Sequence, residues 1–320
     1  MTTEEKTPWD LELFNSEANM DIHRRKAAVA TLSVASNSLL IILKLIVGIV
    51  TGSVSVISEA IHSGVDLIAA IIALFAVRSS AKPADDRHPF GHGKFENISG
   101  AIEALLIFVA AGWIICEAIG KLIHPRPMEA VGWGVAVMLF SSVLNIIVSQ
   151  MLFRVGRESH SVALQADAWH LRTDVYTSAG VMIALAIIVA GEKFFPTMNL
   201  QWIDPVAAII VAMLIIKAAW DLTVHSIYDL LDVSIPLEEQ KWIEELLASY
   251  KPEVHDFHKI RTRKAGHVRY IELHLIVNPD MSVKDSHLLA HQITDRIKEY
   301  FQDSQVITHV EPSDRRDSQT

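Results

Sequence analysis

The chain has 320 residues, of which 51% are hydrophobic and only 20% are charged, and its mean hydropathy is +0.30. This composition excludes an ordinary soluble protein of the same size and indicates a membrane protein. The single cysteine, Cys116, lies in an apolar run, which argues against a disulfide framework and against a thiolate metal site. A formal net charge of −9 without a domain-wide basic face argues against nucleic-acid binding.

The first 20 residues are acidic and lack the charged-then-apolar order of a signal peptide, so they are expected to be frayed, within a cytoplasmic N-terminal tail of residues 1–25. Apolar segments follow that are long enough to cross about 30 Å of hydrocarbon. We expect six spans in a transmembrane domain of residues 26–225, at 27–50, 54–77, 98–123, 131–153, 161–190 and 203–222. Hydropathy alone would begin the fifth span near Val175, but a segment of this length can tilt or extend beyond the bilayer.

Basic residues near the span ends are distributed unequally between the two sides of the membrane. The side of the N terminus carries Arg24, Arg25, Lys26, Arg78, Lys82, Arg87, Lys94, Arg154 and Arg157, and the other side carries Lys121, Arg126 and Lys193. The positive-inside rule therefore predicts that both termini are cytoplasmic.

The second and fifth spans each contain a histidine and an aspartate four residues apart, His62 with Asp66 and His170 with Asp174. Residues four apart lie on one helix face, so each pair offers a nitrogen and an oxygen ligand to the same point. In a soluble helix such a pair is usually a solvated ion pair, whereas ionisable residues inside a bilayer are costly and kept for function. Two such helices facing each other predict a tetrahedral site suited to Zn²⁺.

The polar loop after the second span contains Asp85, His88 and His92, whose spacing could supply a second, three-ligand metal site. Pro89 and Gly91 lie between these ligands and argue against a regular helix, and therefore against a preformed site.

The composition changes after the sixth span, with a linker at 226–235 and a soluble domain at 236–312. The expected elements are a helix at 237–250, strands at 257–263 and 267–277, a helix at 282–301 capped by Asp280, and a strand at 306–310, before a disordered tail at 313–320. The order αββαβ indicates a small two-layer sandwich. His258 and His274 fall on adjacent strands and His309 lies close to Glu311, which makes a structural or regulatory metal site plausible.

These features together resemble the cation diffusion facilitator family, most closely its bacterial zinc and iron efflux pumps. The resemblance lies in the two His-Asp motifs, the loop Phe90-Gly91-His92-Gly93-Lys94-Phe95-Glu96, the junction Leu230-Leu231-Asp232 and the histidine-rich tail. It implies a homodimer in the bacterial inner membrane, with six transmembrane helices and a cytoplasmic domain of metallochaperone or ferredoxin-like fold.

By position, the resemblance implies that His62, Asp66, His170 and Asp174 form the transport site and that Asp85, His88 and His92 form a loop site. It also implies a paired-ion site at the cytoplasmic dimer interface, made by His258, His274, His287, His309 and Glu311, and a salt bridge between Lys94 and Asp232 that couples the domains. Two positions depart from the family. Well-known bacterial relatives carry aspartate where this chain has His62, and the resemblance links histidine at this position to preference for zinc over cadmium. A relative carries aspartate at the position of Glu311.

The expected function is therefore transport rather than catalysis: export of Zn²⁺ in exchange for H⁺ by alternating access, with a further regulatory zinc site. Metal competes with protons for neutral histidine and ionised aspartate, which explains the exchange. Export of Fe²⁺ or another divalent cation and a membrane-anchored metal sensor remain alternatives. An intramembrane hydrolase would need an open coordination position and a general base, for which Glu59 is the candidate, but the sequence has no H-E-x-x-H motif.

Overall fold

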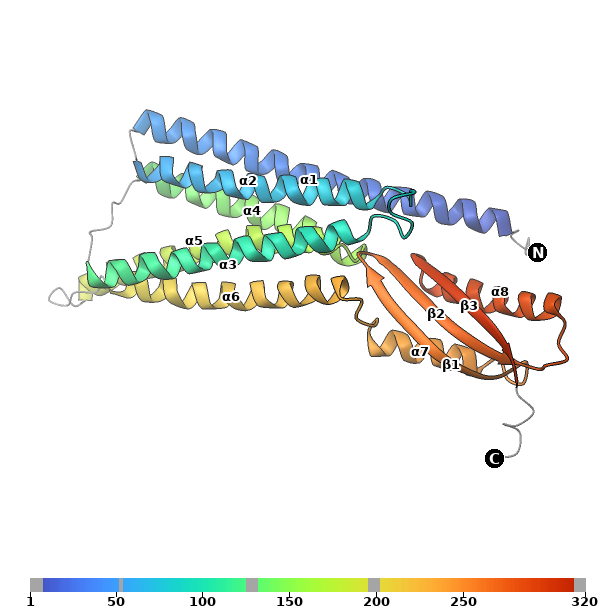
Figure 1. The fold of residues 1–320 in the computed structure, drawn as a ribbon. Helices are drawn as coiled ribbons and strands as arrows, with labels where there is room; N and C mark the ends of the chain where they lie inside the picture. The colour runs from blue at the N-terminus through green and yellow to red at the C-terminus, as the bar shows by residue number, and fades with distance from the viewer. Residues whose placement is uncertain (1–7, 52–53, 125–131, 195–201, 314–320) are drawn as a thin grey trace, which may run out of the picture. The chain divides into compact units, whose positions relative to one another are not determined.

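The computed structural model describes residues 8–51, 54–124, 132–194 and 202–313. They belong to two compact units, a first of residues 16–227 and a second that contains residues 8–15, at the start of the first helix, and the residues from 228 onward. The first unit is built from six long helices: α1 Pro8–Thr51, α2 Val54–Ser80, α3 Lys94–Ile123, α4 Gly132–Glu158, α5 Val162–Phe194 and α6 Ile203–Leu230 (Figure 1).

Helix α1 begins well before the first apolar span. The frayed tail expected at the start of the chain is therefore wrong from Pro8 onward, because these residues are helical. Proline is tolerated in the first turn of a helix, and several strong helix formers lie between Pro8 and Met20. The helix of the first span thus continues into the polar segment that precedes it.

Five helices of the described chain are long and apolar enough to cross a membrane, namely α1, α2, α3, α4 and α6. Helix α5 is not among them. Its first half carries Asp167, His170, Arg172 and Asp174, and many side chains of its apolar second half lie outside the described part. The expectation of six spans therefore stays a prediction, while α5 itself forms as a helix.

Helix α5 packs against the other helices on two sides. One apolar cluster joins α5, through Leu164 and Leu171, to α1, α2 and α4. A second cluster joins α5, through Ala166, to α3 and α6. Alanines at these contacts let the helix backbones approach closely, so α5 occupies the centre of the unit.

Gly100 of α3 lies in close contact with α5 and α6. A Cβ atom at this position would lie 2.6 Å from Ser226 Oγ of α6 and 2.7 Å from Val162 Cγ1 of α5. The missing side chain therefore permits the contact between these three helices.

The second unit contains α7 Leu237–Ala248, β1 Val254–Ala265, β2 Val268–Val277, α8 Val283–Tyr300 and β3 Ser304–Pro312, in the order that the sequence predicts. The three strands are arranged β1-β2-β3, with β1 antiparallel and β3 parallel to β2. Alternate residues of β2 from Ile271 to Val277 are buried against both helices. The helices therefore cover one face of the sheet, and the opposite face of β2 carries Glu272 and His274 together with Tyr270 and Ile276.

Local details differ from the sequence expectations. Helix α8 is capped by Ser282, whose Oγ accepts a hydrogen bond of 3.1 Å from the Asp285 N–H, and not by Asp280. Because α8 begins at Val283, Ser282 occupies the position from which a side chain reaches the free N–H groups of the first turn. Strands β1 and β3 extend further than expected because each pairs with β2 along its length.

Candidate metal sites

The two His-Asp motifs meet between α2 and α5. His170 Nε2 lies 3.0 Å from Asp66 Oδ1, and both residues are only 4% exposed. His62 lies one turn before Asp66 in α2, but its side chain is outside the described part of the structure. One residue from each motif thus reaches the same point, and the place of the His62 ligand stays a prediction.

Asp174 lies one turn after His170 on α5. Its Oδ2 is 3.5 Å from Asn145 Nδ2 of α4, which makes Asn145 a weak hydrogen-bond donor to this carboxylate. The sequence analysis did not single out Asn145. A buried amide in the middle of the fourth span was the available signal, because polar residues inside a membrane are usually functional.

A cavity of about 410 Å³ borders this site. Asp66 and Asp174 line it, together with the polar residues Asn37, Lys44, Ser63, Ser141, Ser142, Asn145, Thr173, Thr177 and Ser178. The lining continues to Glu117 and Lys121, which are exposed and lie in the last two turns of α3. The cavity therefore extends from the two aspartates toward the end of the helix bundle at which α3 finishes.

A positive charge lies in the wall of this cavity. Lys44 of α1 is buried, and its Nζ donates a hydrogen bond of 2.7 Å to Ser63 Oγ of α2. Ser63 directly follows His62 in the sequence, so this contact fixes α1 beside the start of the first motif.

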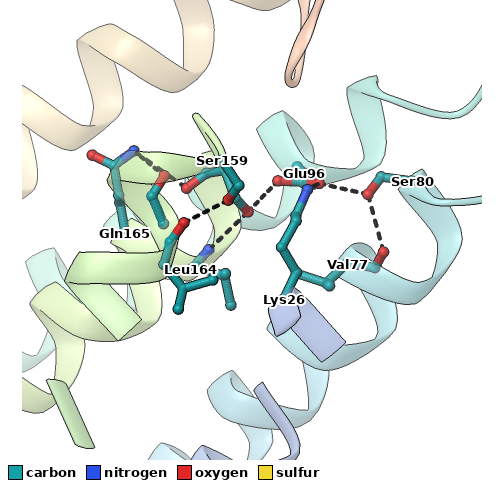
Figure 2. Close-up of polar contacts among 10 residues, drawn as sticks. Lys26, Val77, Ser80, Glu96, Ser159, Leu164 and Gln165 are labelled. Atoms are coloured by element: carbon teal, nitrogen blue, oxygen red, sulfur yellow. Dashed lines mark hydrogen bonds and ion pairs between the residues drawn. The ribbon is translucent and has the colours of Figure 1, made fainter. Parts of the chain in front are cut away.

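The opposite end of the bundle, where α3 begins, is closed by buried polar contacts around Glu96 (Figure 2). The carboxylate of Glu96 accepts hydrogen bonds from Lys26 Nζ of α1, from Ser80 Oγ of α2 at 2.5 Å, and from Ser161 Oγ, immediately before α5. Neither Lys26 nor Glu96 has any exposed surface. The cluster ties four helices together, so the aspartate pair borders a cavity toward one end and a closed bundle toward the other.

The three residues of the predicted loop site also come together. Asp85 Oδ1 lies 3.1 Å from His88 Nδ1, and Asp85 Oδ2 lies 3.3 Å from His92 Nε2. The backbone is not helical, as Pro89 and Gly91 suggest, but the objection to a preformed arrangement is wrong. Asp85 accepts hydrogen bonds from the backbone N–H groups of Arg87 and His88, and this turn holds the ligands together.

The same turn controls the charge of Asp85. The hydrogen bond from the backbone N–H of His88 holds the pKa of the Asp85 carboxyl below its usual value, with a further contribution from the His88 side chain. Asp85 is therefore ionised at neutral pH, which is the form that binds a metal ion.

The second unit brings histidines from all three strands side by side on the face of the sheet opposite to its apolar core. His258 of β1 is paired with His274 of β2, which is paired with His309 of β3. Glu311, two residues after His309, lies on the same face. Its Oε1 is 2.8 Å from His274 Nδ1 and 3.5 Å from His309 Nε2, and its Oε2 is 3.1 Å from His258 Nε2.

These neighbours keep Glu311 ionised. The hydrogen bond with His274 holds the pKa of the Glu311 carboxyl below its usual value, and the charges of His258 and Lys259 act in the same direction. His258, His274 and Glu311 present three atoms within 4.8 Å of one another, which suits a small divalent cation with nitrogen and oxygen ligands.

Three residues assigned by family position stand apart from these groups. His287 lies on α8, where its ring centroid is 4.5 Å from that of His291, and it does not join Glu311 within the described residues of one chain. Asp232 accepts a hydrogen bond of 3.1 Å from Arg263 Nη1. Lys94 belongs to the other unit, so the salt bridge between Lys94 and Asp232 stays a prediction.

Comparison with known proteins covers nearly the whole chain. Residues 30–231 match the family model of the cation efflux transmembrane domain, and residues 235–313 match that of the cytoplasmic domain of cation efflux proteins. An uncharacterised transporter of Synechocystis sp. is 37% identical over 283 residues, which cover 88% of this chain and 89% of the relative. The cation-efflux pump FieF of Citrobacter koseri is 32% identical over 289 residues, which cover 90% of this chain and 92% of the pump. The metal-bound C-terminal domain of the CzcD transporter from Thermotoga maritima is 35% identical over 24% of this chain and 88% of that domain, with a TM-score of 0.23.

Proposed function

Because this chain belongs to the cation diffusion facilitator family, a family of membrane-embedded cation efflux transporters, we propose that it exports Zn²⁺ from the cytoplasm in exchange for protons. The contact between Asp66 and His170 carries this proposal, because it joins the two motif helices beside a cavity. With His62 and Asp174, these residues would hold the ion in a tetrahedron of two nitrogen and two oxygen ligands. The metal ion is the cargo of this site.

Proton exchange follows from the chemistry of the ligands. Imidazole binds a metal only when the coordinating nitrogen carries no proton, and aspartate binds only when ionised. Metal arrival therefore displaces protons, and protonation of the same groups on the far side of the membrane expels the metal. Histidine titrates near neutral pH, so His170 and His62 are suited to this exchange.

The distribution of basic residues supports a topology with six spans and cytoplasmic termini, placed in the bacterial inner membrane. In that topology α3 begins on the cytoplasmic side and finishes on the outer side. The cavity that reaches Glu117 and Lys121 then opens outward, and the Glu96 cluster closes the cytoplasmic end. The described conformation would be the one that releases metal outside the cell.

The cluster of His258, His274 and Glu311, with His309 beside it, would bind regulatory zinc in the cytoplasm. A match to the cytoplasmic domain of cation efflux proteins supports a homodimer formed through this unit, in which His287 of a second copy could complete the site. Zinc held there would tighten the dimer and favour transport when cytoplasmic zinc is high. Asp85, His88 and His92 would bind a further ion on the loop between α2 and α3.

Proteoliposomes with an imposed pH gradient test the main proposal. Zn²⁺ flux and lumenal pH are followed together for the wild type, for Asp174→Ala and for Asp221→Asn, which removes an exposed carboxylate from α6. We expect Zn²⁺ to move against protons in the wild type and in Asp221→Asn, and Asp174→Ala to lose the flux while remaining folded. Wild-type flux in Asp174→Ala would show that the membrane site is assigned wrongly.

The same vesicles distinguish the cargo. Fe²⁺, Co²⁺ and Cd²⁺ are offered to the wild type and to His62→Asp, and we expect Cd²⁺ transport in the variant alone, because imidazole is replaced by a carboxylate. Preferential Fe²⁺ flux in the wild type would make iron the cargo. Zinc binding without flux of any metal would instead indicate a membrane-anchored sensor.

A further inference from the structure

Two carboxyl groups are buried between α3 and α5, apart from the cavity. Glu103 of α3 and Asp167 of α5 have no exposed surface, and the residues next to them in sequence, Ala104 and Ala166, pack in one apolar cluster. Asp167 lies three residues before His170 on α5. Among the described residues that line the cavity, neither Glu103 nor Asp167 occurs. These carboxyls therefore do not line the cavity that borders the metal site.

Most oxygen atoms of this pair lack hydrogen-bond donors. Within the described ranges, Oε2 of Glu103 and both carboxyl oxygens of Asp167 have no hydrogen-bond partner. Ser99 Oγ donates to Glu103 Oε1 at 3.2 Å, and Ser33 of α1 faces Asp167 without completing a hydrogen bond. Unpaired oxygens in fully buried carboxyls require an explanation, since nearly all buried polar atoms in proteins are paired.

The surroundings make a bound proton the best explanation. Ala104 and Ile107 of α3 pack with Ala166 of α5 and with apolar residues of α6 around this pair. An ionised carboxylate without donors is strongly disfavoured in such surroundings, and two neighbouring carboxyls oppose each other's ionisation. A proton removes the charge and turns one oxygen into a donor for the other carboxyl. The pair is built to hold a proton rather than a metal ion, for which it offers no third ligand among the described residues.

The pair also lies between the metal site and the closed end of the bundle. Glu103 is seven residues after Glu96 on α3, a rise of about 10 Å along the helix, with Ser99 between them. On the other side, Asp167 lies about one helical turn before His170, whose Nε2 contacts Asp66 Oδ1. Titratable groups thus continue from the metal site toward the Lys26–Glu96 cluster, away from the cavity.

On the premise of the proton-coupled export proposed above, we propose that Glu103 is a proton-carrying residue of the exchange, which passes protons between Asp167 and the end of the bundle where α3 begins. In each step one carboxylic acid gives its O–H proton to a neighbouring carboxylate, so the donor becomes ionised and the acceptor becomes neutral. Glu103 first releases its proton toward the end of the bundle where α3 begins, and Asp167 then gives its O–H proton to the Glu103 carboxylate. The Asp167 carboxylate left by this transfer accepts the proton that metal displaces at the site. Protons and metal then leave the site in opposite directions without sharing the cavity.

Proton counting tests this role. The number of protons moved per Zn²⁺ is measured in proteoliposomes for the wild type, Glu103→Gln, Glu103→Asp and the exposed control Asp221→Asn. We expect Glu103→Gln to move about one proton fewer per Zn²⁺ and to lose most of the pH dependence of flux, since its amide carries no titratable proton. Glu103→Asp retains a carboxyl and should keep the wild-type ratio, as should Asp221→Asn. Zinc affinity of purified Glu103→Gln should change by less than about twofold, because Glu103 is not a ligand.

The outcomes separate the two proposals. A wild type that moves Zn²⁺ without protons contradicts proton-coupled export itself. A coupled wild type with the same proton ratio in Glu103→Gln overturns only the role of Glu103. Equal loss of coupling in Glu103→Asp and Glu103→Gln also overturns it, since that result would mean a requirement for shape rather than for a proton. If Glu103→Gln does not purify as a folded protein, Asp167→Asn takes its place in the same measurement, with the same expected reduction.

Discussion

Mutation of the ion pair between Lys26 and Glu96 would directly perturb the closed end of the bundle. Both side chains are wholly buried, and the pair joins α1 to α3. Lys26→Met would leave Glu96 with the hydroxyl groups of Ser80 and Ser161 as its donors. Removing one partner of a buried pair costs about 3–5 kcal/mol because an uncompensated charge remains, whereas replacing both partners is often nearly neutral.

The free-energy cost of losing Lys26 destabilises only the conformation in which the ion pair with Glu96 is formed. If the closed end opens during transport, Lys26→Met should favour the opened conformation by up to about 3 kcal/mol, which corresponds to roughly a hundredfold change in the ratio of the two. The double variant Lys26→Met/Glu96→Gln contains no buried charge at this place and should return toward the wild-type ratio. Arg25→Met is the matched control, because Arg25 directly precedes Lys26 on α1 and forms an exposed ion pair of 2.6 Å with Glu158 of α4. Such exposed pairs contribute less than about 1 kcal/mol.

The conformational ratio is read by labelling. In a Cys116→Ser background, a cysteine introduced at Ser178, which lines the cavity, is treated with a membrane-impermeant thiol reagent from the side on which α3 finishes. We expect the labelling rate to fall in Lys26→Met and to recover in the double variant, with little change in Arg25→Met. An unchanged rate in Lys26→Met, or a double variant as perturbed as the single one, would refute the reasoning.

Two further predictions concern the second unit. His274→Ala removes the histidine at the centre of the three-strand cluster. It should lower the amount of zinc bound per chain without abolishing flux at saturating zinc. Unchanged binding stoichiometry and unchanged activation by zinc would contradict a regulatory site there. Glu311→Gln should destabilise the metal-free protein at neutral pH. Because the pKa of Glu311 is held below its ordinary value of about 4.3, its stabilising effect is present above that pH and is lost as the pH falls through the folded-state pKa. Melting curves of wild type and variant should therefore converge in acid, and a difference that persists or grows there would disprove the assignment.

The sequence predicts those parts of the fold and sites that depend on local spacing. Apolar segment length predicts the helices of the first unit, and alternation along β2 predicts which face is buried. The four-residue spacing of the motifs predicts that Asp66 and His170 point from helix faces into the bundle, and their 3.0 Å contact agrees with that expectation. These features follow from helical and strand periodicity, which depends only on residues that are close together in the sequence.

Contacts between distant residues could not be predicted in the same way. Lys26 and Glu96 are 70 residues apart, and nothing in either neighbourhood indicates a buried pair, so Lys26 was interpreted only as a basic residue at a span end. The loop site was doubted because Pro89 and Gly91 exclude a helix, but a side chain can order a turn through backbone N–H groups without any helix, as Asp85 does. Burial and backbone hydrogen bonding decide both cases, and both depend on tertiary structure.

Helix α5 carries residues of both the metal site and the proposed proton path. Asp167, His170 and Asp174 are spaced by three and then four residues, which places them along one stripe of the helix. Asp174 lines the cavity, His170 contacts Asp66 of α2, and Asp167 faces Glu103 of α3. Because the three side chains are fixed to one rigid helix packed against its neighbours on two sides, a tilt or rotation of α5 moves them together. In the proposed exchange, a motion of α5 that closes the cavity over Asp174 would also change the surroundings of Asp167, which would couple metal access to proton binding through this helix.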